Sequence, residues 1–183
     1  MRADAALNRK RILDAARQLA DARGARGLTI AEVADRAGVG KATVIRRFGD
    51  KAALVSALLG EEERRLQEEL IRGKPPLGPG VPAVERAEAF LTALAKLYLR
   101  ELELVYASET AAPGARYRIG AYAAWRQHLM LLVREAKPEL DAALVAHLLL
   151  APLAAESLAE IRRLRRAGAL PQELRALARM LLA

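Results

Sequence analysis

The fold is decided by the stretch Thr29-Ile-Ala-Glu-Val-Ala-Asp-Arg-Ala-Gly-Val-Gly-Lys-Ala-Thr-Val-Ile-Arg-Arg-Phe48. Thr29 and Glu32 match a capping box, in which the threonine hydroxyl accepts from the Glu32 amide and the glutamate reaches back to the Thr29 amide. Gly38 ends this first short helix, because glycine adopts positive φ and permits a tight turn. A second short helix follows over 41–48. Two short helices joined at a glycine predict a helix-turn-helix.

The second short helix presents a polar and cationic face. If Val44 and Phe48 point inward, a rotation of 100° per residue turns Ala42, Thr43 and Arg46 outward. A helix that enters the major groove of DNA needs such a face, with lysine bonding to guanine and threonine to a base edge or phosphate. Lys51 adds its charge to the dipole of the next helix, which favours a phosphate contact. The candidate DNA-binding residues are Thr29, Lys41, Ala42, Thr43, Arg46, Arg47 and Lys51.

The rest of the chain is also helical in pattern. Ala, Leu, Arg and Glu dominate, and no alternation of period two is sustained. Asp50 can cap a helix over 51–72, whose acidic side chains we interpret as a solvated face. Four prolines and three glycines between Gly73 and Pro82 interrupt the helices. The expected helices are 7–23, 30–37, 41–48, 51–72, 83–106, 116–136, 139–167 and 171–182.

Composition and charge limit the range of possible functions. The 183 residues carry a formal net charge of +8, and 53% of them are hydrophobic, so the chain can bury a core. Residues 1–51 hold twelve Lys or Arg against six Asp or Glu, and residues 161–183 hold six against one. Basic surface favours a nucleic-acid partner.

The absence of cysteine excludes disulfides, thiolate metal sites and cysteine catalysis, and it is typical of a reducing compartment. The N-terminus has no apolar segment of a secretory signal. The longest apolar run, 142–155, is shorter than the roughly 20 residues that a membrane helix needs. We therefore expect a cytoplasmic protein with no membrane partner.

Residues 8–60 resemble the tetracycline-repressor (TetR) family of bacterial transcription regulators. The likeness lies in Arg11-Ile-Leu-Asp-Ala-Ala-Arg-Gln-Leu-Ala20, in the stretch from Gly27 to Lys51, and in Ala53-Leu54. It implies an all-α homodimer whose three N-terminal helices bind an operator. The family usually has a tyrosine where this chain has Ile45, and that phenol commonly touches phosphate. We therefore assign the backbone contact to Arg46 and Arg47.

The resemblance completes the expected domain organisation. Residues 1–50 form a helix-turn-helix DNA-binding domain, with the motif at about 28–48, and residues 51–72 form a connecting helix. Residues 73–183 form a helical domain that, in the family, binds a small ligand and dimerises through its last two long helices. The fold class is thus an all-α protein with an N-terminal three-helix DNA-binding domain and a C-terminal ligand-binding and dimerisation domain.

Aromatic residues gather in the C-terminal part of the chain. Six of the seven lie between residues 90 and 125, which suggests a cavity wall or a local core. Tyr122, Trp125 and Leu129 stack at helical spacing, so plain packing explains them equally well. The candidate ligand-binding residues are Tyr98, Glu101, Glu109, Tyr122, Trp125 and His128.

The segment 140–164 is apolar on more than one face, which predicts burial both by its own domain and by a second subunit. With the last helix it would form half of a four-helix dimer interface. The candidate interface residues are Leu144, Leu148, Leu158, Ile161, Leu174, Leu177 and Leu181.

Other sequence patterns give weaker evidence of function. Gly38-Val-Gly-Lys-Ala-Thr43 lacks the first glycine and the Ser or Thr of a phosphate-binding loop, and the two histidines have no metal-ligand spacing, so we expect no cofactor and no metal. The main hypothesis is a homodimeric, ligand-responsive repressor that binds double-stranded DNA at a near-palindromic operator. One alternative is a non-specific DNA-binding or interaction module without an effector. Another is an enzyme that uses Tyr98, Tyr122, His128 and a carboxylate in the aromatic-rich region.

Overall fold

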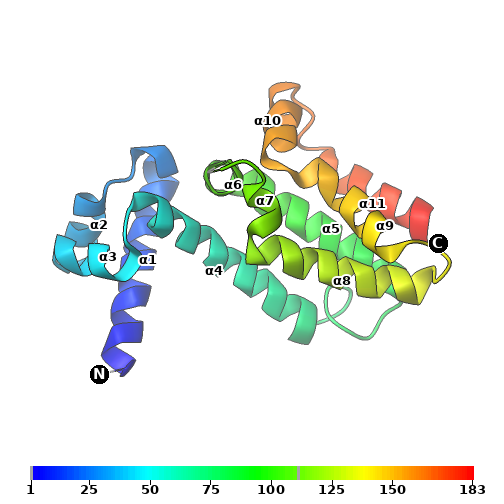
Figure 1. The fold of residues 1–183 in the computed structure, drawn as a ribbon, viewed down its shortest axis with the longest axis horizontal. Coiled ribbons are helices and arrows are strands. Elements are labelled where there is room, and N and C mark those ends of the chain that lie inside the picture. The colour runs from blue at the N-terminus through cyan, green and yellow to red at the C-terminus, as the bar shows by residue number, and fades with distance from the viewer. Residues whose placement is uncertain (1, 111) are drawn as a thin grey trace. The chain divides into compact units, whose positions relative to one another are not determined.

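The computed structural model describes residues 2–110 and 112–183, most of which are helical (Figure 1). The helices group into two compact units, Met1–Glu61 and Glu62–Ala183, and the boundary falls inside α4, Lys51–Arg72. No β-strand occurs in the described ranges. The all-α prediction is confirmed. Helix α4 covers the range expected for a connecting helix, and its two halves belong to different compact units.

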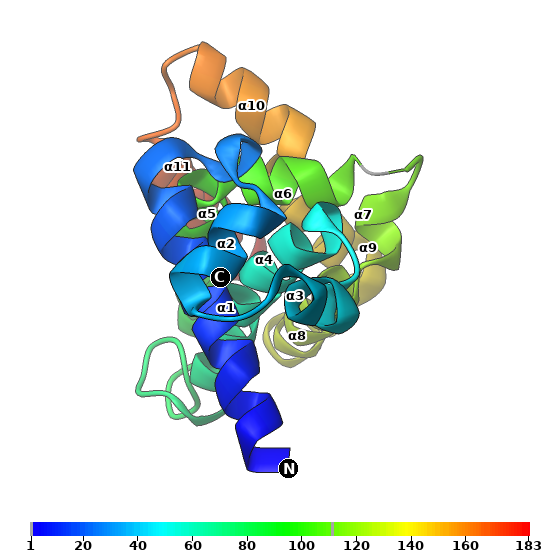
Figure 2. The ribbon, with the colours of Figure 1, turned by 90° about the vertical axis from the view of Figure 1, so that its left-hand side faces the viewer.

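The first unit contains α1 (Arg2–Arg23), the short 3-10 turn η1 (Ala25–Gly27), α2 (Ile30–Ala37), α3 (Lys41–Phe48) and the start of α4. Helix α2 packs against both α1 and α3 (Figure 2). Ile12, Val33 and Val44 are fully buried where the three helices meet. Ala34 and Ala37 are buried beside them, and their small side chains let the helices approach closely.

Local capping decides where the short helices begin. The Glu32 amide donates to Thr29 Oγ1 (3.3 Å), and the Ala53 amide donates to Asp50 Oδ1 (2.8 Å), as expected. The Glu32 carboxylate differs from the prediction, because it accepts from the Thr29 hydroxyl (2.6 Å) and from Arg23 Nη2 (2.7 Å). Arg23 ends α1, and its charge draws the carboxylate away from the Thr29 amide.

The turn between α2 and α3 requires glycine for two reasons. Gly38 has left-handed backbone angles (φ 65°, ψ 40°), which side chains with a Cβ rarely adopt. A Cβ there would also lie 3.0 Å from Arg11 Nη2. That guanidinium donates to the Ala37 carbonyl (2.8 Å), so α1 binds the end of α2 directly. The direction of α3 is therefore set by this turn and by α1 together.

The second unit is a helical bundle that begins with the rest of α4. Helix α5 packs against α11 and α8, and α8 packs against α9. Phe90, Leu94, Trp125, Leu129 and Leu149 are almost completely buried among these helices. The bounds are α5 Ala83–Arg100, α6 Leu102–Glu109, α7 Ala115–Arg118, α8 Gly120–Ala136, α9 Ala142–Leu150, η2 Ala151–Leu153, α10 Ala155–Arg163 and α11 Leu170–Leu182.

Three helices that were expected to be continuous are broken. The segment 83–106 divides at Glu101, 116–136 divides at Ile119, and 139–167 divides into α9, η2 and α10. Pro152 has no amide to donate, and Ala154 is extended (φ −65°, ψ 143°). The apolar periodicity continues on both sides of each break, which is why the sequence pattern suggested single helices.

Arg116 and Glu109 satisfy the backbone groups left free at the break between α9 and α10. The Arg116 guanidinium donates to the carbonyls of Leu150 (2.8 Å) and Leu153 (3.1 Å), and it pairs with the Glu109 carboxylate. That carboxylate accepts from the Ala155 amide at the start of α10 (2.7 Å). The two side chains are 10% and 8% exposed. One buried ion pair therefore joins α6, α7, α9 and α10.

Within the described residues, no single helix combines the length and the hydropathy of a membrane span. The segment formed by α9 and η2 has the required length and hydropathy only when it is taken together with α10, and the two are bent by 45° relative to each other.

We predict that Arg116→Ala lowers the free energy of unfolding by about 3 kcal/mol, because it leaves the Glu109 carboxylate buried without its cation. Urea denaturation followed by circular dichroism measures this change. Arg134→Ala, an exposed arginine on α8, is the matched control and should change stability by less than about 0.5 kcal/mol. Equal losses in the two variants would contradict the role of the buried pair.

Candidate nucleic-acid interface and buried polar cluster

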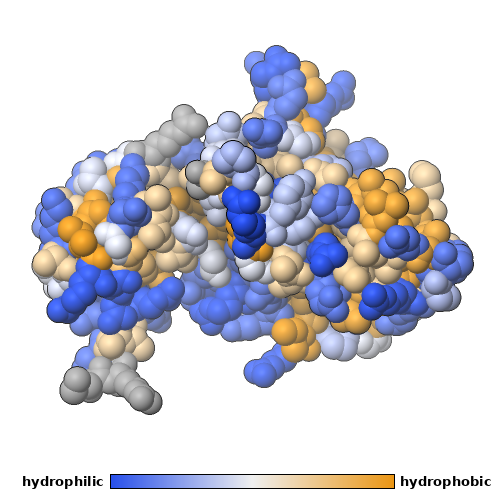
Figure 3. Space-filling view, in the orientation of Figure 1, coloured by the Kyte–Doolittle hydropathy of each residue, from blue (hydrophilic) through white to orange (hydrophobic). Residues whose placement is uncertain are grey.

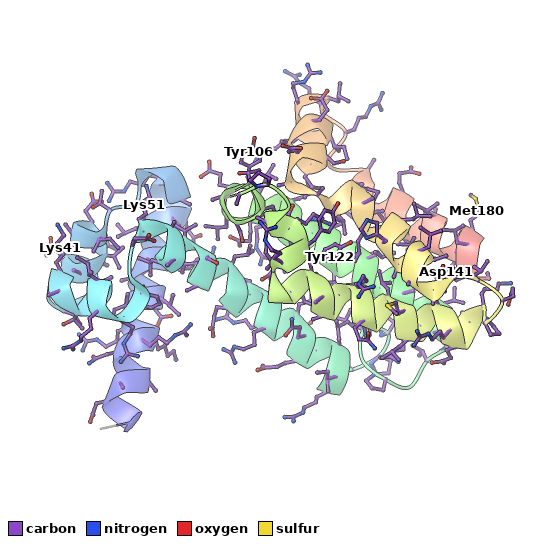
Figure 4. The ribbon with its side chains drawn as sticks, in the orientation of Figure 1. Lys41, Lys51, Tyr106, Tyr122, Asp141 and Met180 are labelled. Carbon is purple, nitrogen blue, oxygen red and sulfur yellow. The ribbon has the colours of Figure 1, made fainter. Side chains whose placement is uncertain are left out.

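Helix α3 exposes the face that the sequence predicts. Val44 is fully buried, whereas Lys41, Ala42 and Arg46 are exposed and Thr43 is half-buried. Figure 4 shows Lys41 at the surface of the first unit. Gly40 precedes the helix without a side-chain cap, so the first amides of α3 are not blocked by a capping side chain. The helix therefore offers short polar and cationic side chains beside open backbone donors.

The described residues do not neutralise the charges of this face. No ion pair involving Lys41, Arg46 or Arg47 occurs among residues 2–110 and 112–183, whereas Arg9 pairs with Glu61 (3.7 Å) and Arg23 with Glu32 (2.7 Å). Unpaired cations on one helix attract phosphate by counterion release. The same surface is therefore suited to the DNA backbone.

Two other predicted positions lie at helix starts. Thr29 is exposed at the N-terminus of α2, and its hydroxyl is engaged by Glu32. Lys51 is half-buried at the N-terminus of α4. Helix N-termini favour anions, although the Glu32 and Ala53 amides at these two termini are already bound by Thr29 and Asp50. The assignment of these residues to DNA contacts stays a prediction.

The structure adds details that the sequence pattern missed. Phe48 was expected to point inward, but it is only half-buried, and the Arg9 guanidinium lies 5.8 Å from its ring centroid. Ile45 is 45% exposed on the flank of α3. Arg11 was not proposed as a functional residue, yet its bond to Ala37 positions the turn before α3. Its spacing along α1 gave no sign of this long-range contact.

The comparisons with known proteins agree with this geometry. A family model described as "Bacterial regulatory proteins, tetR family" matches residues 12–58, which include α2 and α3. The uncharacterised HTH-type transcriptional regulator YvkB of Bacillus subtilis (strain 168) is 50% identical over 52 residues. The N-terminal segment of the chain therefore matches the tetR family of bacterial regulatory proteins. The segment shared with YvkB spans 28% of this chain and 28% of that relative.

Solved structures extend the likeness to nearly the whole chain. A TetR transcriptional regulator from Rhodococcus sp. RHA1 aligns with a TM-score of 0.67 at 20% identity, covering 98% of each chain. The fatty acid degradation regulator FadR from Bacillus halodurans aligns with a TM-score of 0.68 at 18% identity, covering 96% of this chain and 94% of its own. At these identities the likeness establishes the fold. The tetR family consists of transcription factors, which argues against the enzyme alternative.

Three of the six ligand-binding candidates lie in one buried cluster of the second unit. The Trp125 Nε1–H donates to the Tyr98 hydroxyl oxygen (3.1 Å), and that hydroxyl donates to Glu63 Oε1 (2.8 Å). Phe90 lies between Trp125 (ring centroids 5.6 Å apart) and His128 (5.1 Å). These contacts form a continuous row from α4 through α5 to α8.

The cluster shifts the titration of its polar groups. Burial raises the pKa of Glu63 to about 7, against the lowering effect of the Tyr98 hydrogen bond. Burial likewise raises the pKa of Tyr98 well above its ordinary value. Burial, and then the charge of Arg86, lowers the pKa of His128 to about 4. His128 Nε2 is buried and has no hydrogen-bond partner.

Glu63 is the residue that the sequence reasoning missed. The acidic side chains of α4 were interpreted as a solvated face, but Glu63 is only 6% exposed. The correction has a simple cause, because the buried face of α4 runs through Leu59, Glu63, Leu66 and Leu70. A carboxylate at the apolar spacing of a helix was the available signal.

The other candidates lie outside this row. Tyr122 OH is 2.6 Å from His147 Nδ1, and Tyr117 stacks on the same imidazole (Figure 4 labels Tyr122). Glu109 is bound to Arg116 and the Ala155 amide, and Glu101 is bound to Arg100 (2.9 Å). Glu109 therefore serves the helix break, and the six candidates do not converge on one point.

A surface groove of about 520 Å³ lies between α5, α11 and the residues before α5. The buried Glu88 at its wall binds Arg175 (2.9 Å) and Arg179 (2.6 Å), and these guanidiniums lower its pKa despite the opposing effect of burial. None of the predicted ligand-binding residues lines it. Among the described residues, no group of three or more His, Asp or Glu side chains is arranged to hold a metal ion.

The predicted dimer-interface residues differ in their solvent exposure. Leu144 (55% exposed), Leu148 (56%) and Leu181 (38%) are at the surface, and Ile161 and Leu177 are half-buried. Leu158 and Leu174 are buried inside their own subunit, because α10 packs on α6 and α11 packs on α5. These two leucines belong to the core of the subunit, so we leave them out of the proposed interface.

We predict different effects for two lysines near the interface. Lys51→Ala should weaken binding to every duplex and reduce the slope of log K against log salt by about one, as expected for a phosphate contact. Lys41→Ala should instead relax sequence preference at one base pair, at a cost of about 1–3 kcal/mol for the preferred site. Fluorescence anisotropy over a salt series measures both, with Lys74→Ala as an exposed control in the second unit. A purely uniform loss for Lys41→Ala would contradict its assignment to base reading.

Proposed function

We propose that this chain is a homodimeric, one-component transcription regulator that represses by binding a near-palindromic operator in the cytoplasm. The observation that carries the proposal is the exposed cationic face of α3, around Lys41, Thr43 and Arg46, within the segment matched to the tetR family. Phosphate contacts from Arg46 and Arg47 would fix the register, and Lys41, Ala42 and Thr43 would read the bases.

Exposed apolar side chains on α9 and α11 support dimerisation. Leu144 and Leu148 lie one turn apart on α9, and Met180 (80% exposed) and Leu181 lie near the end of α11. Figure 3 shows a hydrophobic area over α9. Such areas on a protein surface mark interaction sites, and a second copy of this chain is the partner that a two-fold operator requires.

Ligand response is the third part of the proposal. The row of Glu63, Tyr98, Trp125, Phe90 and His128 combines apolar rings with a few polar groups, as small-molecule sites do. An effector that prefers a conformation with a different spacing of the two recognition helices would lower operator affinity by linkage. Tyr122, Glu101 and Glu109 contribute less to this proposal, because other contacts engage them.

Selection of bound duplexes from a random pool tests the DNA-binding part. We expect a near-palindromic consensus whose half-sites are centred about one helical turn apart, roughly 34 Å, because two recognition helices must enter successive major grooves. Enrichment without any consensus would identify the alternative, a non-specific module. A single unrepeated half-site would contradict the dimer.

We predict that Leu148→Asp weakens the dimer roughly hundredfold, since it would bury an unpaired charge in the interface. Sedimentation equilibrium measures the dissociation constant. Leu131→Asp is the matched control, because Leu131 is a comparably exposed leucine (53%) on α8, outside the proposed interface. Dissociation by the control and not by Leu148→Asp would move the interface to α8.

A further inference from the structure

Glu63 differs from the other buried glutamates in having no cationic partner. Among the described residues, Glu63, Glu88 and Glu101 are buried as whole residues, and the side chain of Glu109 is buried against Arg116. Glu88 binds Arg175 and Arg179, and Glu101 binds Arg100. Glu63 receives a hydrogen bond from the Tyr98 hydroxyl, and Glu109 is the charged group that acts on it most directly.

A buried carboxyl group that has no cationic partner can avoid the cost of a buried charge by binding a proton. Burying an ionised carboxylate is costly unless a positive charge or several donors compensate it. Tyr98 supplies one donor, and the Trp125 N–H is used on the Tyr98 oxygen rather than on the carboxylate. The pKa of Glu63, about 7, shows that protonation supplies the missing compensation near neutral pH.

The surroundings of Glu63 favour a positive ligand over a negative one. Its neighbours are the Tyr98 hydroxyl, to which the Trp125 N–H is bonded, and the carboxylate of Glu109, so no positive group offsets its charge when it ionises. His128 at the other end of the row is neutral above pH 5, since its pKa is about 4. The charge of Arg86 acts on His128 and is absent from the groups that shift the pKa of Glu63.

We propose that Glu63 is the charge-recognition group of the effector site, and that the effector carries one compact cationic group, an ammonium or quaternary ammonium, on an aromatic or apolar body. The cation would take the place of the Tyr98 hydroxyl proton donor at the carboxylate, with the rings of Tyr98, Trp125 and Phe90 around the body. The proposal rests on the proposed function of the second unit as an effector-binding domain. The unpartnered Nε2 of His128 adds a hydrogen-bonding point at the far end of the row.

The proposal predicts the direction of the pH dependence. A cation binds the ionised carboxylate and releases its proton, so affinity falls as the pH drops below about 7 and levels off above it. Two other titratable groups facing this row do not change charge between pH 5.5 and 8.5, because the pKa of Tyr98 is raised and the pKa of His128 is lowered. Burial raises the pKa of Glu109 against the opposing charge of Arg116, so the Glu63→Gln variant below is the measurement that assigns the pH dependence to Glu63.

Trp125 provides the measurement, because it is the only tryptophan of the chain. Benzyltrimethylammonium is titrated into the full-length protein while tryptophan fluorescence is followed, with benzylsulfonate as a probe of similar size and opposite charge. We expect saturable binding of the ammonium alone. Its dissociation constant should rise about tenfold per pH unit below pH 6.5 and stay nearly constant above pH 8.

Variants separate charge recognition from packing. Glu63→Gln should bind the ammonium at least about tenfold more weakly at pH 8 and lose the pH dependence, because its side chain cannot ionise. Glu69→Gln, an exposed carboxylate on the same helix, should behave as the unaltered protein. The pH series on the unaltered protein needs no variant, so a folding defect in Glu63→Gln leaves the test intact.

The experiment separates failure of the Glu63 assignment from failure of the proposed regulator function. Equal binding of sulfonate and ammonium, a flat pH profile, or no saturable binding of the ammonium would overturn the role of Glu63 and make the Glu63–Tyr98 pair part of the core alone. Operator binding is measured separately by anisotropy. Ammonium binding that leaves operator affinity unchanged would support the charge assignment and contradict ligand response.

Discussion

The left-handed turn at Gly38 is the constraint on which the DNA-binding unit depends. It turns the chain between α2 and α3 within three residues, and Arg11 of α1 binds the Ala37 carbonyl just before it. With Val44 buried against this frame, the outward direction of Lys41, Thr43 and Arg46 follows from helical geometry. A side chain at position 38 would strain the backbone and displace Arg11 at once. The presentation of the recognition face is therefore a property of three helices, not of α3 alone.

The second unit uses buried charge in two ways. The Arg116–Glu109 pair is satisfied on all sides and closes a helix break, so its charges stabilise one arrangement of α6, α7, α9 and α10. Glu63 is buried with a single hydroxyl donor and no guanidinium, so it is left to bind a proton. A satisfied pair fixes structure, whereas an uncompensated carboxyl can respond to pH or to a ligand.

Much of the DNA-binding face was predictable, and little of the buried cluster was. The turn glycine, the Thr29 cap and the inward Val44 are local signals, since each acts within one or two helical turns. Glu63, Tyr98 and Trp125 come from three different helices, and their hydrogen bonds span 27 to 35 residues of chain. Periodicity identifies which residues are apolar-facing, but it does not tell which faces meet.

The amino-acid sequence by itself determined the helical class, the end of α1, the positions of α2 to α4, the glycine turn and the cationic side of α3, because these depend on propensity, capping and the 3.6-residue period. Helix α1 begins at Arg2, five residues before the expected start. Only the tertiary structure decided that Pro152 divides one expected helix into α9 and α10, that Leu158 and Leu174 belong to the core, and that Glu63 is buried beside Tyr98. Those outcomes depend on which helices pack together, and the free energy of burying a side chain is set by its neighbours in space.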